Sequence, residues 1–230
     1  MAFSYGWRGP NIVKDGLVLY LDPGSPNSYF DKSSTLVKDI SSFNSNADLI
    51  SGPIYNPENG GSISLDGTDD YISIPKTGIL SGKSEFTISL WTYPSSFVGV
   101  RPLFVNYYVG NLEVLTRFNG TNLQFYTYSS TNVQVGGTTQ AYSTLNQWVN
   151  IVATYDGTIM KTYVNGIQSP TTYNRTGILN TSTLPYLIGR YSSPTEYRYQ
   201  GRFSQTLIYV KSLTAQEILQ NYNATKTRFQ

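Results

Sequence analysis

The chain of 230 residues carries 16 Lys and Arg against 14 Asp and Glu, a net charge of +2, and it contains neither Cys nor His. Without these two residue types there is no Ser-His-Asp or Cys-His nucleophile, no thiolate or imidazole zinc site and no disulfide framework. Charged residues make up only 13% of the chain, too few for a phosphate-binding surface, so we expect no nucleic-acid partner.

Residues 1–16 predict an N-terminal arm, because aromatic side chains alternate there with glycine and proline. The arm either packs across its own domain or crosses to a neighbouring subunit, since exposed aromatic residues that cover nothing reduce solubility. We expect no secretory signal and no membrane span, because no apolar run approaches the roughly 20 residues that a span needs. The candidates for assembly contacts in the arm are Phe3, Tyr5, Trp7 and Arg8.

Residues 17–230 predict one domain that is built almost entirely of short strands. Apolar and polar residues alternate with period two, and Asn119-Gly120 and Asp156-Gly157 are the dipeptides expected at tight hairpin turns. The fold class is therefore all-β. The strands expected from the alternation are residues 17–21, 62–65, 71–74, 86–93, 112–118, 123–128, 148–155, 159–164, 186–188 and 203–209.

One helix is predicted near the end, at about residues 214–224. Thr214 and Glu217 have the spacing of a capping box, in which each side chain bonds the backbone N–H of the other residue. Leu213 and Ile218 have the spacing of a hydrophobic staple, which fixes how the chain enters the helix. We expect this helix to pack on the sandwich, and we expect packing roles for Trp91 and Trp148.

Four segments, in order, resemble the laminin-G-like domains with a concanavalin A-like fold. The first, with the sequence DGTDDYISIP, resembles the family pattern DG-x-DDY-x-x-P, and the third contains TYDG followed by YVNG. The resemblance implies a two-sheet antiparallel jelly-roll sandwich with one short C-terminal helix. The segments are residues 65–75, 86–94, 147–166 and 187–218.

Two positions depart from the family pattern. The last strand often carries acidic residues where this chain has Ser204 and Gln205, and the hairpin often has His where this chain has Asn150. Concanavalin A-like glycosidases carry a Glu-x-Asp-x-Glu strand that supplies two catalytic carboxylates, and no such triplet occurs here. We therefore expect no enzymatic activity.

A narrower resemblance involves the two ends of the domain. Residues 9–22 and 219–229 are similar to laminin-G-like proteins of tailed bacteriophages, which are virion structural components such as capsid decorations, fibres or tail parts. The resemblance implies a homo-oligomer, for which we predict a trimer, made in the bacterial cytoplasm and placed on the virion surface. Its expected partners are virion proteins such as the major capsid protein, with weak adhesion to cell-surface glycans.

Tyrosine and arginine residues predict a contact surface, for glycans or for protein partners. Aromatic rings stack on the apolar faces of sugars, and Tyr and Arg are also enriched at protein interfaces, so both alternatives stay open. The candidates are Tyr107, Tyr108, Tyr126, Tyr128, Arg190, Tyr197, Arg198, Tyr199 and Arg202.

Oxygen ligands are the only metal ligands that this composition offers. Asp66, Asp69 and Asp70 cluster near a predicted turn, and carboxylates suit Ca²⁺, although a turn-capping role explains them equally well. We expect no cofactor, with Ca²⁺ as the one candidate ion. The sequence thus predicts a non-enzymatic, lectin-like virion protein. The alternatives are a secreted bacterial carbohydrate-binding module and a remnant glycosidase.

Overall fold

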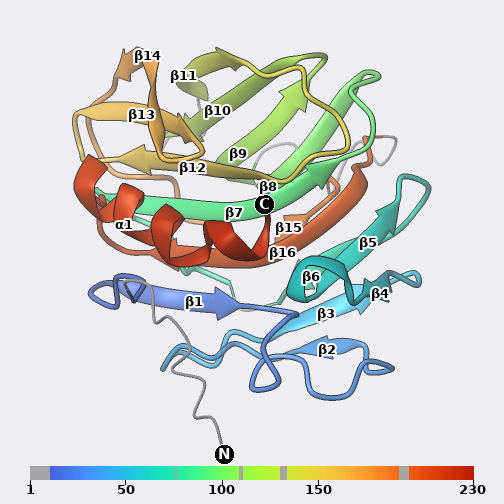
Figure 1. Ribbon diagram of the computed structural model, residues 1–230. Coiled ribbons are helices and arrows are strands. Elements are labelled where there is room, and N and C mark those ends of the chain that lie inside the picture. The colour runs from blue at the N-terminus through green and yellow to red at the C-terminus, as the bar shows by residue number, and fades with distance from the viewer. Residues whose placement is uncertain (1–10, 76, 109–110, 130–133, 192–196) are drawn as a thin grey trace, which may run out of the picture.

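The computed structural model describes residues 11–75, 77–108, 111–129, 134–191 and 197–230. Over these residues the chain forms two antiparallel eight-stranded sheets packed face to face, with one α-helix outside them (Figure 1). The predicted all-β sandwich with a C-terminal helix is confirmed. No helix in the described ranges is long and apolar enough to cross a membrane.

The first sheet, sheet A, has the strand order β14-β13-β12-β7-β16-β5-β4. One edge of β16 pairs with β7, and the other edge pairs with β5 in its first half and with β1 in its second half. Strand β16, near the C-terminus, therefore holds β1, the first strand of the domain. The strands of sheet A are β1 (Leu17–Leu21), β4 (Ile54–Asn56), β5 (Ser62–Asp66), β7 (Phe86–Pro94), β12 (Val149–Tyr155), β13 (Ile159–Val164), β14 (Ile167–Asn174) and β16 (Gln200–Tyr209).

The second sheet, sheet B, has the strand order β11-β10-β9-β8-β15-β6-β3-β2. The hairpin predicted at Asn119-Gly120 joins β9 to β10, and Gly120 has the positive φ of 55° that the turn requires. The strands of sheet B are β2 (Leu36–Val37), β3 (Ala47–Ile50), β6 (Tyr71–Ile74), β8 (Val100–Tyr108), β9 (Asn111–Asn119), β10 (Asn122–Tyr128), β11 (Gln134–Ala141) and β15 (Tyr186–Ile188).

The main core lies between the sheets and is rich in aromatic rings. Phe86 of β7 meets Phe125 of β10 edge to face, at a centroid distance of 6.0 Å, and Phe104 of β8 stacks on Tyr186 of β15 at 5.4 Å. These residues occupy the alternate, inward-facing positions of their strands, as the period-two pattern predicts. The polar positions of the same strands consequently form the outer faces of the sheets.

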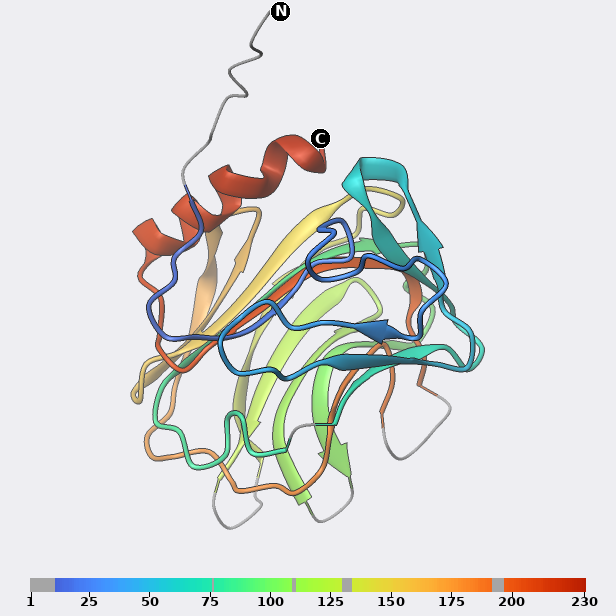
Figure 2. The same cartoon turned by 90° about the horizontal axis from the view of Figure 1, so that it is seen from below.

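The helix α1 (Ala215–Thr225) lies across the outer face of sheet A, on the side away from sheet B (Figure 2). The predicted capping box is present: Glu217 N–H donates to the Thr214 hydroxyl, and Thr214 N–H donates to the Glu217 carboxylate. Leu213 and Ile218 are buried in one cluster with Leu207 of β16. A short 3-10 helix, η2 (Lys226–Arg228), follows α1 and carries the chain along the face of sheet A.

The described part of the predicted arm, residues 11–16, packs against α1. Ile12 is buried in the same cluster as Ile218, and Val13 N–H donates to the Asn221 side chain at 2.8 Å. Gln220 donates to the Asn11 carbonyl at 2.7 Å. Residues 11–16 thus contact their own domain. The assembly candidates Phe3, Tyr5, Trp7 and Arg8 lie outside the described residues.

Candidate functional site

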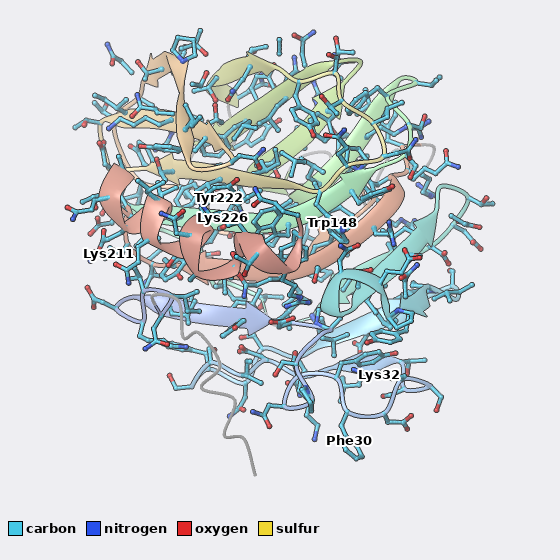
Figure 3. The ribbon with its side chains drawn as sticks, viewed as in Figure 1. Phe30, Lys32, Trp148, Lys211, Tyr222 and Lys226 are labelled. Carbon is cyan, nitrogen blue, oxygen red and sulfur yellow. The ribbon has the colours of Figure 1, made fainter. Side chains whose placement is uncertain are left out.

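A groove of about 520 Å³ opens on the outer face of sheet A, beside the C-terminal end of α1. Figure 3 shows Trp148, which lies in its wall, next to that end of the helix. This volume lies in the range of small-molecule sites in proteins. The residues that line this groove, which we call the Trp148 groove, are Glu58, Asn59, Tyr93, Asn146, Gln147, Trp148, Asn165, Arg202, Phe229 and Gln230.

Three of these side chains form one row across neighbouring strands. Arg202 of β16 is the register partner of Tyr93 of β7, and Trp148 immediately precedes Val149, whose partner is Thr92 of β7. The Arg202 guanidinium lies 4.0 Å from the Tyr93 ring centroid and 5.6 Å from that of Trp148. The Tyr93 and Trp148 rings meet edge to face at 5.6 Å. All three side chains are partly exposed, so they present aromatic and cationic surface to the groove.

Gly201 makes the close pairing of β16 with β7 possible. Its φ is 145°, and a Cβ atom at this position would lie 2.2 Å from the Tyr93 carbonyl oxygen. Any larger residue would push the strands apart or force the backbone to shift. The glycine therefore permits the strand pairing that places Arg202, the next residue, opposite Tyr93.

The charge of Arg202 is compensated within the groove. Its Nη1 donates to the Glu58 carboxylate at 2.7 Å, and the Glu58 side chain is exposed. Glu58 comes from the short 3-10 helix η1 (Glu58–Gly60), which Arg228 holds by donating to the Asn59 carbonyl at 3.1 Å. Among the described lining residues the groove thus carries one cationic and one anionic side chain, and its other polar groups are amides, the Tyr93 hydroxyl and the Trp148 indole N–H.

Phe229 of the C-terminal segment lines the groove and packs on aromatic rings beneath it. Phe229 is buried, and its ring stacks on Trp91 at a centroid distance of 4.3 Å and contacts Trp148 at 4.9 Å. Trp91 is also buried, stacks on Tyr222 of α1 and donates its indole N–H to Thr225 at 3.0 Å. The predicted packing role of Trp91 is confirmed. Trp148 packs as well, but it also lines the groove.

The indole N–H of Trp148 has no hydrogen-bond partner among the described residues, although the nitrogen itself is buried. An unpaired buried donor costs free energy and calls for an explanation such as a bound water or ligand oxygen. Trp148 itself lines the groove.

The predicted Tyr and Arg contact surface is divided between the two sheets. Among the candidates whose side chains are described, Arg202 is the one that lines the Trp148 groove. Tyr126 and Tyr197 are partly buried on the outer face of sheet B, packed on a cluster that contains Tyr128. Arg190 stacks over the Tyr71 ring at 4.4 Å. Its bridge partner Arg198 donates to the Tyr197 carbonyl at 3.2 Å. The structure therefore does not assemble these residues into one site.

For two of the candidates, Tyr199 and Tyr128, the predicted contact role is wrong because their side chains are buried. Tyr199 is 0% exposed, because its side chain turns into the core, where its hydroxyl lies 2.5 Å from Thr92 Oγ1 and burial raises its pKa. Tyr128 is 4% exposed. Neither ring offers a face to a ligand. Tyr107 and Tyr108 lie in β8, and their side chains are outside the described part of the structure.

The predicted acidic cluster is brought together at the β5–β6 turn. One carboxylate oxygen from each of Asp66, Asp69 and Asp70 lies within 4.8 Å of the others. The Asp66 carboxylate accepts from Thr68 N–H, which lowers its pKa, whereas burial raises the pKa of Asp70. Such a set of oxygens has the chemistry of a Ca²⁺ site, but the turn hydrogen bonds account for it equally well. Ca²⁺ binding stays a prediction.

The fold and the site together describe a concanavalin A-like jelly roll with a partly exposed aromatic groove. The sequence matches the family model Laminin_G_3, the concanavalin A-like lectin/glucanases superfamily, over residues 66–219, and the chain belongs to this family. This match confirms the family resemblance of the four segments. No curated protein matches the sequence.

Similar solved structures share the fold at low sequence identity. The receptor binding domain of botulinum neurotoxin D has a TM-score of 0.73 at 15% identity, with 91% of this chain and 52% of that chain covered. The binding domain of Paraclostridial Mosquitocidal Protein 1 has a TM-score of 0.71 at 20% identity, covering 92% and 52%. A third match, at 13% identity and a TM-score of 0.73, is a botulinum neurotoxin serotype D ligand binding domain in complex with N-acetylneuraminic acid, covering 91% and 51%. The chain thus spans about half the length of these structures.

Proposed function

We propose that the protein is a non-catalytic carbohydrate-binding domain whose sugar site is the Trp148 groove. The observation that carries this proposal is the row of Trp148, Tyr93 and Arg202, partly exposed across three neighbouring strands. Aromatic rings stack on the C–H faces of sugars, while guanidinium and amide groups bond sugar hydroxyls. The similar structures that are receptor or ligand binding domains support a binding role.

A non-catalytic role agrees with the acidic groups of the groove. Hydrolysis by a retaining or inverting glycosidase uses a pair of carboxyl groups on the two sides of the scissile bond. Among the described side chains that line the groove, Glu58 is the one carboxylate, and Arg202 pairs with it. A glycosidase would need a second carboxyl group in this groove, so binding without cleavage is the simpler function.

The test is a glycan array followed by calorimetric titration of the best ligand. Trp148→Ala should weaken binding at least tenfold, because stacked aromatic rings are typical binding hot spots. Phe30→Ala removes an aromatic ring that is 86% exposed and lies outside the groove, so it should leave binding unchanged. Saturable glycan binding that Trp148→Ala does not weaken would overturn the proposal, and so would a chain that binds no glycan.

We further propose that the domain serves in the virion of a tailed bacteriophage, as a capsid decoration or fibre-type component. The two terminal stretches that resemble phage proteins contact each other: Val13 N–H donates to the Asn221 side chain, and Gln220 donates to the Asn11 carbonyl. They therefore form one structural unit beside the β1–β16 ladder. The proposed partners are copies of itself, as a trimer, and virion proteins such as the major capsid protein.

Immunogold labelling of particles of a phage whose genome encodes the chain tests this role. Labelled particle surfaces, and a trimeric mass in mass photometry, are the expected results. Protein found in the culture medium of phage-free cells would instead favour a secreted bacterial carbohydrate-binding module. In that case the sugar-binding proposal stands and the virion proposal fails.

A further inference from the structure

A second groove, of about 460 Å³, lies away from the Trp148 groove. It forms where β1 and the end of β16 meet the loops that follow β2 and β6, and it is lined by Val18, Phe43, Ser45, Thr77, Gly78, Ile79, Lys83 and Val210. The two grooves share no lining residue. We call this one the Ser45 groove. Any ligand that it binds is therefore separate from the proposed sugar.

The walls of the Ser45 groove are mainly aliphatic. Val18 and Ile79 are buried, Val210 is partly buried, and the Phe43 ring is 48% exposed. An apolar hollow of this size favours an apolar body, because burying methylene groups away from water stabilises the complex.

One polar group in the wall lacks a hydrogen-bond partner among the described residues. Ser45 is 1% exposed, and its hydroxyl has no hydrogen-bond partner among the described residues. A hydroxyl buried in this way costs free energy, and a ligand oxygen that bonds it would remove that cost. The unpaired hydroxyl therefore indicates a polar atom on the ligand.

Lys83 gives the groove its charge. Its side chain is exposed, and no carboxylate in the described part of the chain forms an ion pair with it. Besides Lys83, the polar side chains among the described lining residues are Ser45 and Thr77, and none of these lining residues is acidic. The electrostatic complement of this site is a single negative charge.

The loop that carries Ser45 and Phe43 is held in place by a buried carboxylate. Asp39 accepts from the backbone N–H groups of Tyr20, Ser41 and Ser45, each at 2.8 Å, and from the Ser41 hydroxyl at 2.7 Å. Four hydrogen bonds to one carboxylate fix the wall before any ligand arrives, which reduces the entropic cost of binding.

From these features we infer that the Ser45 groove binds a small anionic amphiphile, with an alkyl body against Val18, Ile79 and Val210. Its carboxylate head accepts from the Ser45 hydroxyl and lies near the Lys83 ammonium. This combination of an aliphatic cleft, an unpaired hydroxyl and one uncompensated cation distinguishes the site from the Trp148 groove, where amides and stacked rings predominate.

Isothermal titration calorimetry of the full chain with octanoate, and with uncharged octanol for comparison, tests the inference. Octanoate should bind saturably and more tightly than octanol. Lys83→Met should weaken octanoate binding up to about fivefold, the range of a partly exposed ion pair, and leave octanol binding unchanged. Lys161→Met, which removes a partly exposed lysine on β13 outside the groove, is the matched control.

Ser45→Ala separates binding from folding. The variant should bind octanoate about two- to tenfold more weakly, whereas its melting temperature in the absence of ligand should not fall, because an unpaired buried hydroxyl has been removed. Octanoate that does not bind saturably, or that binds equally well to the Lys83 and Ser45 variants, overturns the inference.

Discussion

Arg228 forms an ion pair with Asp22, and its Nη1 lies 2.7 Å from Oδ1 and 2.9 Å from Oδ2 of the carboxylate. The Asp22 side chain is almost completely buried. Nη2 of the same guanidinium donates to the Gly61 carbonyl and to the Ser204 hydroxyl, at 2.8 and 2.7 Å. This cluster connects the end of β1, the start of β5 and the C-terminal segment behind the Trp148 groove.

Arg228→Met should lower the free energy of unfolding by about 3 kcal/mol, because it leaves a buried carboxylate without its cation. Urea unfolding followed by tryptophan fluorescence measures this change. The double variant Asp22→Asn with Arg228→Met should recover a large part of the loss, since the uncompensated charge is gone. A single-variant loss below about 1 kcal/mol would show that the ion pair is not needed to hold the segment.

Glu58→Gln should change the sugar preference of the Trp148 groove toward acidic glycans. In the native groove Glu58 compensates the charge of Arg202, and the variant leaves that charge available. We expect the ratio of affinities for acidic over neutral glycans to rise about three- to fivefold, as for a partly exposed ion pair. Competition binding measures this ratio.

Asp156→Asn is the control for this charge change, because Asp156 pairs with Lys161 outside the groove, at 3.9 Å. It removes one negative charge from the chain without altering the environment of Arg202. An equal change of preference in both variants would mean that net charge, and not the groove, sets the preference.

The carboxyl of Glu113 should make the stability depend on pH in a window where few other groups titrate. Glu113 is completely buried in β9, and burial raises its pKa above the ordinary value. It accepts from the Ser81 hydroxyl, from the Tyr186 hydroxyl at 2.5 Å and from Ser182 N–H at 2.8 Å. Because the chain contains no His, no imidazole contributes between about pH 5 and 8.

The direction of this pH dependence follows from the raised pKa of Glu113. The folded state binds the Glu113 proton more tightly than the unfolded state does, so this stabilising contribution is complete below about pH 4 and is lost as the pH rises through the folded-state pKa. Urea midpoints at several pH values should fall over this range in the native chain and fall less in Glu113→Gln. Parallel curves for the two proteins would refute this assignment.

The capping box of α1 should contribute about 1 kcal/mol to the free energy of unfolding. Thr214→Ala removes the hydroxyl that accepts from Glu217 N–H, and the loss of an N-cap side chain typically costs this amount. Chemical denaturation is again the measurement. Thr227→Ala changes an exposed threonine beyond the helix and should have no effect.

The sequence was sufficient for the fold class, for the two hairpin turns and for the helix, because alternation, Asn-Gly or Asp-Gly dipeptides and capping spacing are local signals. Strand β8 was missed because Pro102 interrupts it, and β11 because Gly136 and Gly137 dilute its pattern. Tertiary pairing, which a single sequence does not show, completes these strands.

The site was predicted less well than the fold. Tyr93 and Trp148 were visible as strand residues, but their alignment with Arg202 depends on β16 pairing with β7, two strands far apart in sequence. Tyr199 was assigned to an exposed surface because it lies among Tyr and Arg residues. Gly201, with its φ of 145°, follows two residues later in an irregular stretch where alternation did not reveal that Tyr199 faces the core.

The position of β16 also determines when the domain is able to form during synthesis. Strand β1 pairs with β16, and Asp22 meets Arg228 across 206 positions of the chain. The ribosome therefore releases β1 long before its partners exist, and the outer face of sheet A closes only when nearly all of the described chain has emerged. Such non-local pairing slows folding. Until then the apolar residues Leu17, Leu19 and Leu21 of β1 are available to chaperones or to other nascent copies.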